Sequence, residues 1–177
     1  PIVFDERGHH HPVDPAHLPV ELPELVDYQL RRSGVEVRFE LDRAEPLVMA
    51  DHFQMEQLFL NLVLNALQAM PREGTLTTRT ENAVFEQDEY KPYRVKAGRY
   101  VKISIADTGE GMDKETQRRI FDPFFTTKER GRGTGLGLSS AYGIIKNHNG
   151  FIDVDSELNR GATFKIYLPI SNKKVFN

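Results

Sequence analysis

Apolar and polar residues alternate along the chain with two periods, one typical of strands and one typical of helices. Strands are expected at residues 35–41, 47–50, 75–84, 99–108, 151–157 and 162–170. Apolar residues at helical spacing predict helices at 21–33, 51–70 and 136–149, with Asp51 as a candidate cap of the second. Segments 85–98 and 109–134 are interpreted as mostly loop, and a turn is expected at Asn159–Gly161. Strands mixed with three helices predict an α+β sandwich in which one sheet is covered on one face.

The composition limits the kinds of partner. With 177 residues and a net charge of −3, the chain is long enough for a sizeable core and has no basic excess that would favour nucleic acid or an anionic membrane. No apolar run reaches the roughly 18 residues that a membrane-spanning helix needs. The absence of cysteine excludes disulfides and thiolate metal sites and favours a reducing compartment. We therefore expect a cytoplasmic location, without nucleic-acid or membrane contact by this chain.

The chain begins at Pro1, which indicates a piece of a longer protein. Residues 1–16 are rich in proline and histidine and lack a clear period, so we interpret them as a linker. The histidines at 9–11 favour a solvated turn over a metal site, because no carboxylate lies at ligand spacing. Residues 17–171 are expected to form the domain and 172–177 a C-terminal tail.

A stripe of side-chain amides runs along the helix predicted at 51–70. Its members recur at spacings of three or four and therefore share one face: Gln54, Gln57, Asn61, Asn65 and Gln68. The other faces are mostly apolar, so the helix should be largely buried. The stripe fits either a polar seam against a helix or water, or a wall that faces a polar ligand. Without a carboxylate beside them, Asn61 and Asn65 favour a Mg²⁺ ion that arrives with a nucleotide.

Asp107 stands at the end of a predicted strand. Val101, Ile103 and Ile105 point to one face of that strand, and Asp107 continues the face. A carboxylate buried there needs a partner. It is either the cap of a turn or short helix, or an acceptor for a ligand such as the adenine amino group. Gly109 and Gly111 would let a flat ring lie against the backbone.

Alternate glycines precede the helix predicted at 136–149, at Gly131, Gly133, Gly135 and Gly137. The run is not a P-loop, and it is not the dinucleotide fingerprint, because Leu136 stands where that fingerprint requires glycine. Free N–H groups at a helix N-terminus bind anions, and glycines let more of them turn inward. The upstream cations Lys128, Arg130 and Arg132 favour a loop that closes over phosphates; a flexible hinge loop is the alternative.

Taken together in order and spacing, these motifs resemble the ATP-binding domain of bacterial sensor histidine kinases, which has the Bergerat fold. NLVLNA (61–66), DTGEGM (107–112), FDPFFTTK (121–128) and GTGLGLS (133–139) are similar to the N, G1, F and G2 boxes, and GATF (161–164) to the last turn. The segments NALQAM (65–70) and FFTTK (124–128) resemble those of nitrogen-regulation sensor kinases. The resemblance spans about residues 20 to 170. It implies a two-layer sandwich, with a mixed five-stranded sheet and about three helices on one face.

The resemblance also implies roles at the base of a bound ATP. Asp107 would accept a hydrogen bond from the adenine amino group. Gly109 and Gly111 would form the floor under the base, and Thr163 would assist there. Met112 is a further expected nucleotide contact.

At the phosphates, the resemblance implies that Asn65 ligates Mg²⁺ and that Asn61 lines the same wall. Lys128 would reach the terminal phosphate, with Thr127 beside it. Phosphate-binding glycines and N–H groups are expected at Gly133, Gly135, Leu136, Gly137 and Leu138. Residues 113–134 would form a lid that is mobile without nucleotide, hinged or pinned by Phe121, Phe124 and Phe125.

Kinases of this family transfer the γ-phosphoryl group of ATP to a histidine on a separate helical hairpin. None of the six histidines here lies in a His-Glu motif followed by proline, so we expect the hairpin to be missing from this chain. Residues 1–16 would be its trailing linker. The resemblance implies a homodimeric full-length kinase with a response-regulator partner, whereas the fragment is expected to be a monomer.

Two other functions share this ATP fold or its boxes. Gyrase-type ATPases and heat-shock chaperones place a glutamate, the general base for water, where Asn61 stands, and an amide cannot take that proton at neutral pH. This disfavours ATP hydrolysis. A serine kinase that acts on a partner protein is closer, and the boxes alone do not separate it from a histidine kinase.

Overall fold

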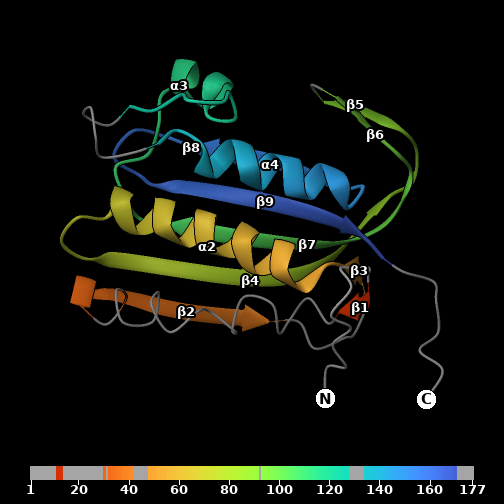
Figure 1. Ribbon diagram of the computed structural model, residues 1–177, viewed down its shortest axis with the longest axis horizontal. Helices are drawn as coiled ribbons and strands as arrows, with labels where there is room; N and C mark the ends of the chain where they lie inside the picture. Colours follow the sequence, from red (N-terminus) through yellow and green to blue (C-terminus); the bar gives the residue numbers. More distant parts are fainter. Residues whose placement is uncertain are drawn as a thin grey trace.

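The computed structural model describes residues 11–13, 30, 32–41, 48–91, 93–127 and 134–170. Its centre is a five-stranded sheet (Figure 1) in the order β2 (Val35–Leu41), β4 (Gly74–Phe85), β7 (Gly98–Asp107), β9 (Ala162–Pro169) and β8 (Phe151–Ser156). β2 runs parallel to β4, and the other neighbours are antiparallel. The mixed sheet is therefore confirmed, and each strand begins and ends within one residue of its predicted bounds.

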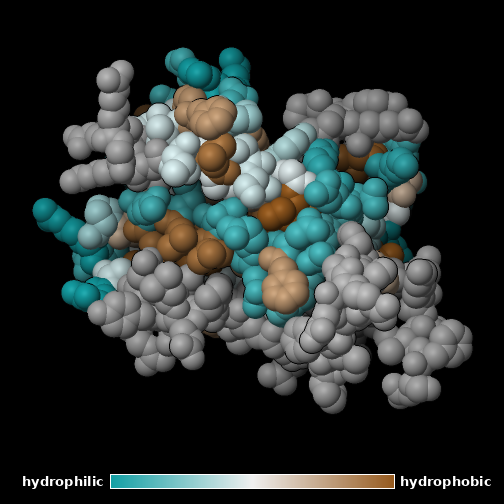
Figure 2. All heavy atoms as spheres, in the orientation of Figure 1, coloured by the Kyte–Doolittle hydropathy of each residue, from teal (hydrophilic) through white to brown (hydrophobic). Residues whose placement is uncertain are grey.

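Two helices cover one face of the sheet, as Figure 1 shows: α2 (His52–Ala69) and α4 (Gly137–Asn147). The core lies between these helices and the sheet, and its fully buried side chains include Phe59 and Leu62 from α2, Ile145 from α4, Ile103 from β7 and Ile166 from β9. Hydrophilic side chains cover much of the outer surface of this layer (Figure 2). No helix in the described part of the chain is long and apolar enough to cross a bilayer.

The ends of both helices follow from local chemistry. The carboxylate of Asp51 accepts from the backbone N–H of Gln54 at 3.1 Å, which confirms Asp51 as the cap of α2. α4 ends two residues earlier than predicted, because Asn149 has a left-handed φ of 55°. Gly150 N–H then donates to the Ile145 carbonyl at 2.9 Å, which closes the helix.

A third, short helix, α3 (Lys114–Arg119), lies in a segment that the sequence analysis interpreted as loop. Asp113 caps it through the N–H of Thr116 at 2.7 Å. With six residues, this helix is too short to show a hydrophobic period, which is why pattern reading misses it. The helix predicted at 21–33 lies largely outside the described residues, although Leu30 and residues 32–33 are helical.

Three strands of three residues were also not predicted, and one of them pairs with the strand expected at 47–50. β5 (Glu89–Lys91) and β6 (Tyr93–Val95) form a hairpin inside the segment interpreted as a charged loop. β1 (His11–Val13) pairs antiparallel with β3 (Val48–Ala50). Strands of this length carry too few residues for alternation to be visible, so their pairing depends on tertiary context.

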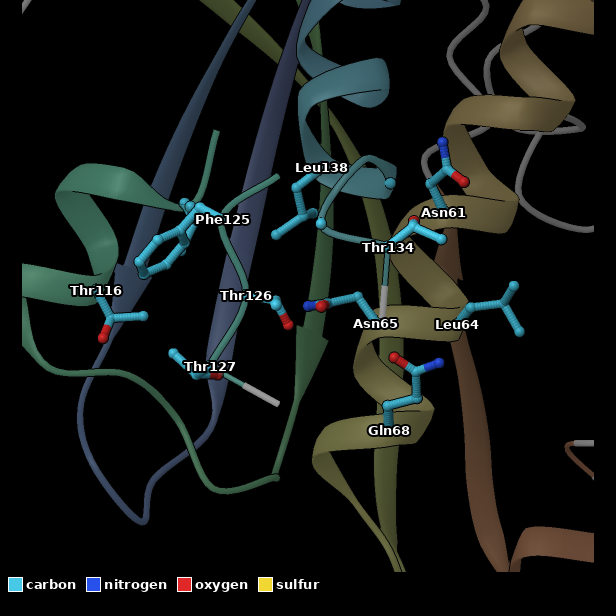
Figure 3. Close-up of a pocket in the computed structure, with 13 residues that line it drawn as sticks. Asn61, Leu64, Asn65, Gln68, Thr116, Phe125, Thr126, Thr127, Thr134 and Leu138 are labelled. Carbon is cyan, nitrogen blue, oxygen red and sulfur yellow. The ribbon is translucent and has the colours of Figure 1, made fainter. Parts of the chain in front are cut away.

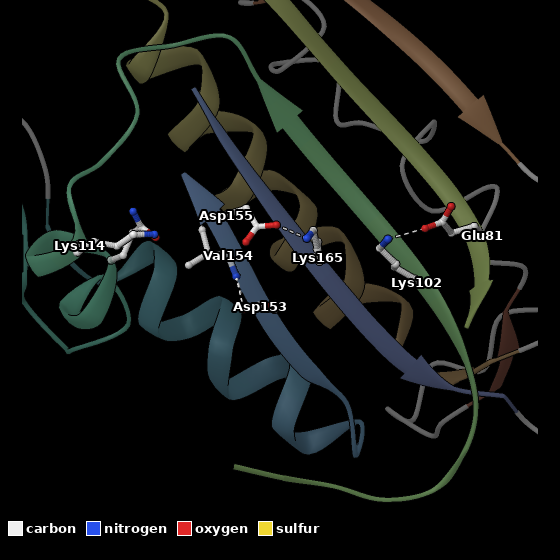
Figure 4. A network of polar contacts seen from close by, with 8 residues as sticks. Glu81, Lys102, Lys114, Asp153, Val154, Asp155 and Lys165 are labelled. Carbon is white, nitrogen blue, oxygen red and sulfur yellow. Dashed lines mark hydrogen bonds and ion pairs between the residues drawn. The ribbon is translucent and has the colours of Figure 1, made fainter. Parts of the chain in front are cut away.

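The face of the sheet opposite the helices is polar at one end and aromatic at the other. Lys102 pairs with Glu81 and Lys165 with Asp155 across neighbouring strands (Figure 4). Farther along the same face, Phe151 stacks on Tyr167 with ring centroids 4.3 Å apart. Side chains at odd positions of β9, including Lys165 and Tyr167, therefore point away from the helices.

Candidate functional site

Two adjoining cavities lie beside α2. The first has a volume of about 250 Å³ and is lined by residues that include Asn61, Gln68, Phe125, Thr134, Gly137 and Leu138. The second, of about 390 Å³, is lined by residues that include Ala69, Asp107, Glu110, Gly111, Met112, Asn159 and Ala162. Asn65, Thr116 and Thr127 line both cavities, so the two form one continuous cleft. Its size is that of a small-molecule site.

Three of the five amides in the predicted stripe face the cleft: Asn61, Asn65 and Gln68. Figure 3 shows Asn65 reaching from α2 toward Thr126 on the opposite wall. Gln54 instead serves the helix cap, where its side chain donates to Asp51 at 3.2 Å. Gln57 donates to Asn61 Oδ1 at 3.0 Å. The stripe is therefore partly a ligand wall and partly internal support for α2.

Asn61 carries an unusual polar atom. Its Nδ2 is buried and has no hydrogen-bond partner among the described residues. A buried donor left unpaired costs about 1–3 kcal/mol, so this atom favours a ligand that brings an acceptor into the first cavity. The hydrogen bond from Gln57 occupies the Oδ1 of Asn61 and leaves its Nδ2 available.

Asp107 ends β7 at the bottom of the second cavity and is only 6% exposed. Its Oδ1 accepts from the N–H of Gly109 at 2.8 Å and from the N–H of Ala162 at 3.4 Å. Burial raises the pKa of the Asp107 carboxyl above its usual range, and these two hydrogen bonds offset part of the rise. The nearby Glu110 carboxylate raises the pKa further. A partner that donates to this carboxylate is therefore favoured.

The glycines after Asp107 serve close backbone packing. Gly111 has a φ of 64°, and a Cβ there would lie 2.0 Å from the Glu157 carbonyl oxygen. A Cβ on Gly109 would lie 2.5 Å from the Ala69 carbonyl oxygen. Gly111 lines the second cavity as expected, but Gly109 is not among its described lining residues. Glycine is needed at position 109 because the backbone there packs against the C-terminal end of α2.

Thr163 does not take the place that the sequence analysis gave it. Asp107 pairs with Ala162 across β7 and β9, so these two side chains share a face. Thr163 is the next residue and points to the opposite face of the sheet, with Lys165. The prediction for Thr163 is corrected by one residue, because Ala162 lines the second cavity. The methyl side chain of Ala162 has no polar group that would mark it as a site residue in the sequence.

The N-terminus of α4 opens into the first cavity. Gly137 and Leu138 line that cavity, and the cap residue Leu136 has no side chain able to bond the first N–H groups. No side chain of the described residues caps these donors, which suits an anion. Leu136 itself lies outside the cavity lining, and its N–H donates to Thr134 Oγ1 at 3.3 Å. The predictions for Lys128 and Gly133 fall outside the described residues.

The three phenylalanines before this helix differ in burial. Phe121 and Phe125 pack against the core, and Phe125 also lines the first cavity. Phe124 is 75% exposed and has a φ of 65°. Only Phe121 and Phe125 therefore anchor the segment between α3 and α4 through their side chains.

Charged metal ligands are lacking among the described lining residues of the first cavity. In the described ranges, no three His, Asp or Glu side chains gather in a metal-binding group. The first cavity has no carboxylate among its described lining residues, although Asn61, Asn65 and Gln68 supply amide oxygens. This donor set fits Mg²⁺ held mainly by ligand oxygens rather than by the protein alone.

Thr116 was missed by the sequence analysis, although it lines both cavities. It lies on α3, whose existence the hydrophobic pattern does not reveal. Its only sequence signal is the Asp113 cap three residues earlier.

Residues 50–172 match the family of histidine kinase-, DNA gyrase B- and HSP90-like ATPases. Sensor kinase CckA of Brucella abortus is 46% identical over 142 residues, which cover 78% of this chain and 15% of that protein. Sensor histidine kinase ZraS of Klebsiella oxytoca is 37% identical over 172 residues, covering 92% of this chain and 34% of that protein. The chain thus spans about a third or less of the length of these curated relatives.

Solved structures of histidine kinases match this chain over one domain. The nucleotide-free catalytic domain of histidine kinase ThkA superimposes with a TM-score of 0.73 and 29% identity, covering 91% of this chain and 95% of that one. Full-length ShkA in complex with AMPPNP gives a TM-score of 0.73 at 25% identity, covering 96% of this chain and 32% of that one. The chain therefore belongs to the histidine kinase-, DNA gyrase B- and HSP90-like ATPase family, as an ATP-binding catalytic domain of the sensor histidine kinase kind.

Proposed function

We propose that this domain binds ATP with Mg²⁺ in the cleft and supplies the γ-phosphoryl group to a histidine on a separate helical hairpin of the whole protein, in two-component signal transduction. One observation carries the proposal. A single cleft has a buried carboxylate, Asp107, in one cavity and the uncapped N-terminus of α4 in the other. These are complementary to the two chemically different ends of ATP, a base that donates and phosphates that accept.

At the base end, ionised Asp107 accepts from the adenine amino group. Guanine presents an oxygen at the same place, so GTP would face the carboxylate without a donor. Gly111 and Met112 line this cavity beside Asp107, and Ala162 leaves room for the ring because its side chain is small.

At the phosphate end, the N–H groups of Gly137 and Leu138 point toward the phosphates, with the positive end of the α4 dipole behind them. Asn61 Nδ2 donates to a phosphate oxygen and so gains the hydrogen-bond partner that it otherwise lacks. Asn65 contributes its amide oxygen to Mg²⁺, which neutralises charge on the phosphates. Lys128 is proposed to reach the terminal phosphate.

Neither His52 nor His148 is placed to act as the nucleophile for the γ-phosphate. His148 is buried, with Nδ1 2.7 Å from the Ile144 carbonyl oxygen and Nε2 accepting from the Asp51 N–H at 3.0 Å. His52 pairs with Glu56 at 3.2 Å. Neither histidine lines the cleft. Asn61 cannot remove a proton from water, so transfer to an incoming imidazole is favoured over hydrolysis.

Partners are inferred from the relatives. ThkA has been solved in complex with the response regulator TrrA, and that kinase aligns with this chain at a TM-score of 0.69 and 27% identity. We infer that the full-length protein is a homodimer that passes its phosphoryl group to a response regulator. By itself, the present chain is proposed to be a monomer.

The test mixes this chain with the helical hairpin encoded upstream of it. With Mg-ATP, the mixture should form acid-labile phosphohistidine on the hairpin, and the chain alone should form none. Asn65→Ala should suppress the transfer. If the chain alone hydrolyses ATP at an enzymatic rate of roughly 1 s⁻¹ or faster, the kinase proposal fails and the ATPase function of the wider family takes its place.

A further inference from the structure

The side chain of Gln117 joins α3 to two other segments. Its Nε2 donates to the carbonyl of Met112 and to the carbonyl of Ser156, both at 2.9 Å. Met112 belongs to the loop after Asp107, and Ser156 is the last residue of β8. One amide therefore joins a helix and the loop just before it to a strand end 39 residues away in the sequence.

Ser156 completes this joint from the other side. Its Oγ accepts from the N–H of Met112 at 2.9 Å and donates to the carbonyl of Gly161 at 2.8 Å. Both backbone polar groups of Met112 are thus held, one by Ser156 and one by Gln117. Because Met112 lines the second cavity, the joint fixes the wall beside the base.

The same joint sets the position of α3 against the cleft. Thr116, immediately before Gln117, lines both cavities, and Asp113 at the start of α3 lines the second. The helix has six residues, none of them buried, and only its C-cap residue Ile120 reaches the hydrophobic core. The two hydrogen bonds from Gln117 are its main described attachment to the walls of the second cavity.

We propose that Gln117 is a positioning residue for nucleotide binding, which seats α3 and Met112 so that the cleft fits its ligand; this inference rests on the proposed function, because the ligand is the nucleotide. The residue acts through Met112 and Thr116 and does not line the cleft itself. The role depends on the carboxamide, since one nitrogen supplies both donated protons.

That dependence makes glutamate an informative substitution. Glutamate has nearly the same shape, but its carboxylate donates nothing and would place negative oxygen against two carbonyls. Gln117→Glu should weaken AMPPNP binding about tenfold or more at neutral pH. Gln117→Ala, which removes the donors without adding charge, should weaken it less. A protonated glutamate can donate again, so the affinity of Gln117→Glu relative to the unsubstituted chain should recover as the pH falls.

The experiment measures AMPPNP affinity by calorimetry for the unsubstituted chain, Gln117→Glu, Gln117→Ala and the control Arg118→Ala. Arg118 is exposed on the same helix and lines neither cavity. The ligand-free melting temperature of each variant reports folding, and Gln117→Ala decides the matter if Gln117→Glu does not fold. With the hairpin present, a positioning role raises KM for ATP and leaves kcat at saturating ATP nearly unchanged.

The two proposals fail in different ways. If the unsubstituted chain does not bind AMPPNP, the proposed function is wrong. If it binds but folded Gln117→Ala binds equally well, or loses kcat without a higher KM, Gln117 has no positioning role and the proposed function stands.

Discussion

The backbone N–H of Phe124 donates to the carbonyl of Gly135 at 3.0 Å, so residues eleven apart in the sequence meet beside the first cavity. Gly135 has a φ of 67°, and a Cβ there would lie 2.5 Å from the Phe124 carbonyl carbon. The contact therefore requires glycine, for conformation as well as for space. The hydrogen bond brings together two positions of the segment that joins α3 to α4.

Gly135→Ala should accordingly weaken nucleotide binding by about tenfold or more, because strain of roughly 1–3 kcal/mol falls on the phosphate end of the cleft. Calorimetry with AMPPNP measures the loss. The matched control is Gly143→Ala on α4, where an added Cβ meets nothing within 4 Å. The control should keep its affinity and gain stability of about 0.5–1 kcal/mol. Equal affinity of both variants would contradict this account of Gly135.

Asp107→Asn tests the base end of the cleft. The amide would still accept from the N–H groups of Gly109 and Ala162 but would no longer offer a carboxylate to the adenine amino group. We expect ATP affinity to fall about ten- to a hundredfold. In the unsubstituted chain, GTP should bind less tightly than ATP by a similar factor. Equal calorimetric affinities for ATP and GTP would remove Asp107 from base recognition.

Nucleotide affinity should depend on pH through the same group. Burial raises the pKa of Asp107 in the ligand-free domain, and adenine binds the ionised form. Binding should therefore weaken as the pH falls through that pKa, with protons released on binding near it. The contribution of Asp107 to the free energy of unfolding changes with pH in the opposite direction. The cost of burying its charge is present above the folded pKa and disappears as the pH falls. Asp107→Asn should flatten the dependence of affinity on pH in titrations; an unchanged slope would assign it to another group.

Metal dependence can be separated from base binding with Asn65→Ala. Because the described residues of the first cavity bring no carboxylate, Mg²⁺ alone should bind weakly to the ligand-free chain. In the variant, Mg²⁺ should no longer strengthen ATP binding, while most ADP affinity should remain. Titration of Mg²⁺ with and without nucleotide measures both effects. Tight binding of Mg²⁺ to the ligand-free chain would reveal a different metal site.

Two neighbouring residues on β9 test whether Ala162, rather than Thr163, lies beside the base. Ala162→Val adds two methyl groups to the lining of the second cavity and should weaken AMPPNP binding severalfold. Thr163→Val changes the opposite face of the sheet and should leave affinity unchanged. A loss confined to Thr163→Val would restore the sequence-based prediction.

Much of this fold was predictable because long elements carry their own pattern. β2 has its predicted bounds, and α2 differs by one residue at each end. Asp107 was also recognisable, since it continues an alternation of buried residues into a polar loop. α3 and the β5–β6 hairpin were missed, because they are too short to show a period.

The site was less predictable than the fold for reasons that are visible in particular residues. Thr163 was chosen for its hydroxyl, but strand register decides which of two neighbours faces the cleft, and it selects Ala162. Gln117 looks like an ordinary polar residue in the sequence. Its two acceptors are backbone carbonyls, one of them 39 positions away, and backbone acceptors leave no trace in a sequence pattern.

The hydrogen bond between His148 and Asp51 has a consequence for nucleotide exchange. It ties the C-terminal end of α4 to the N-terminal end of α2, so the two helices that carry Gly137 and Asn65 cannot separate as a whole without breaking this part-buried hydrogen bond. Displacement of α3, whose Thr116 lines both cavities, would widen the cleft while this contact stays intact. We therefore expect product release to be asymmetric, with ADP departing past α3 while the wall formed by α2 and α4 stays in place for the next ATP.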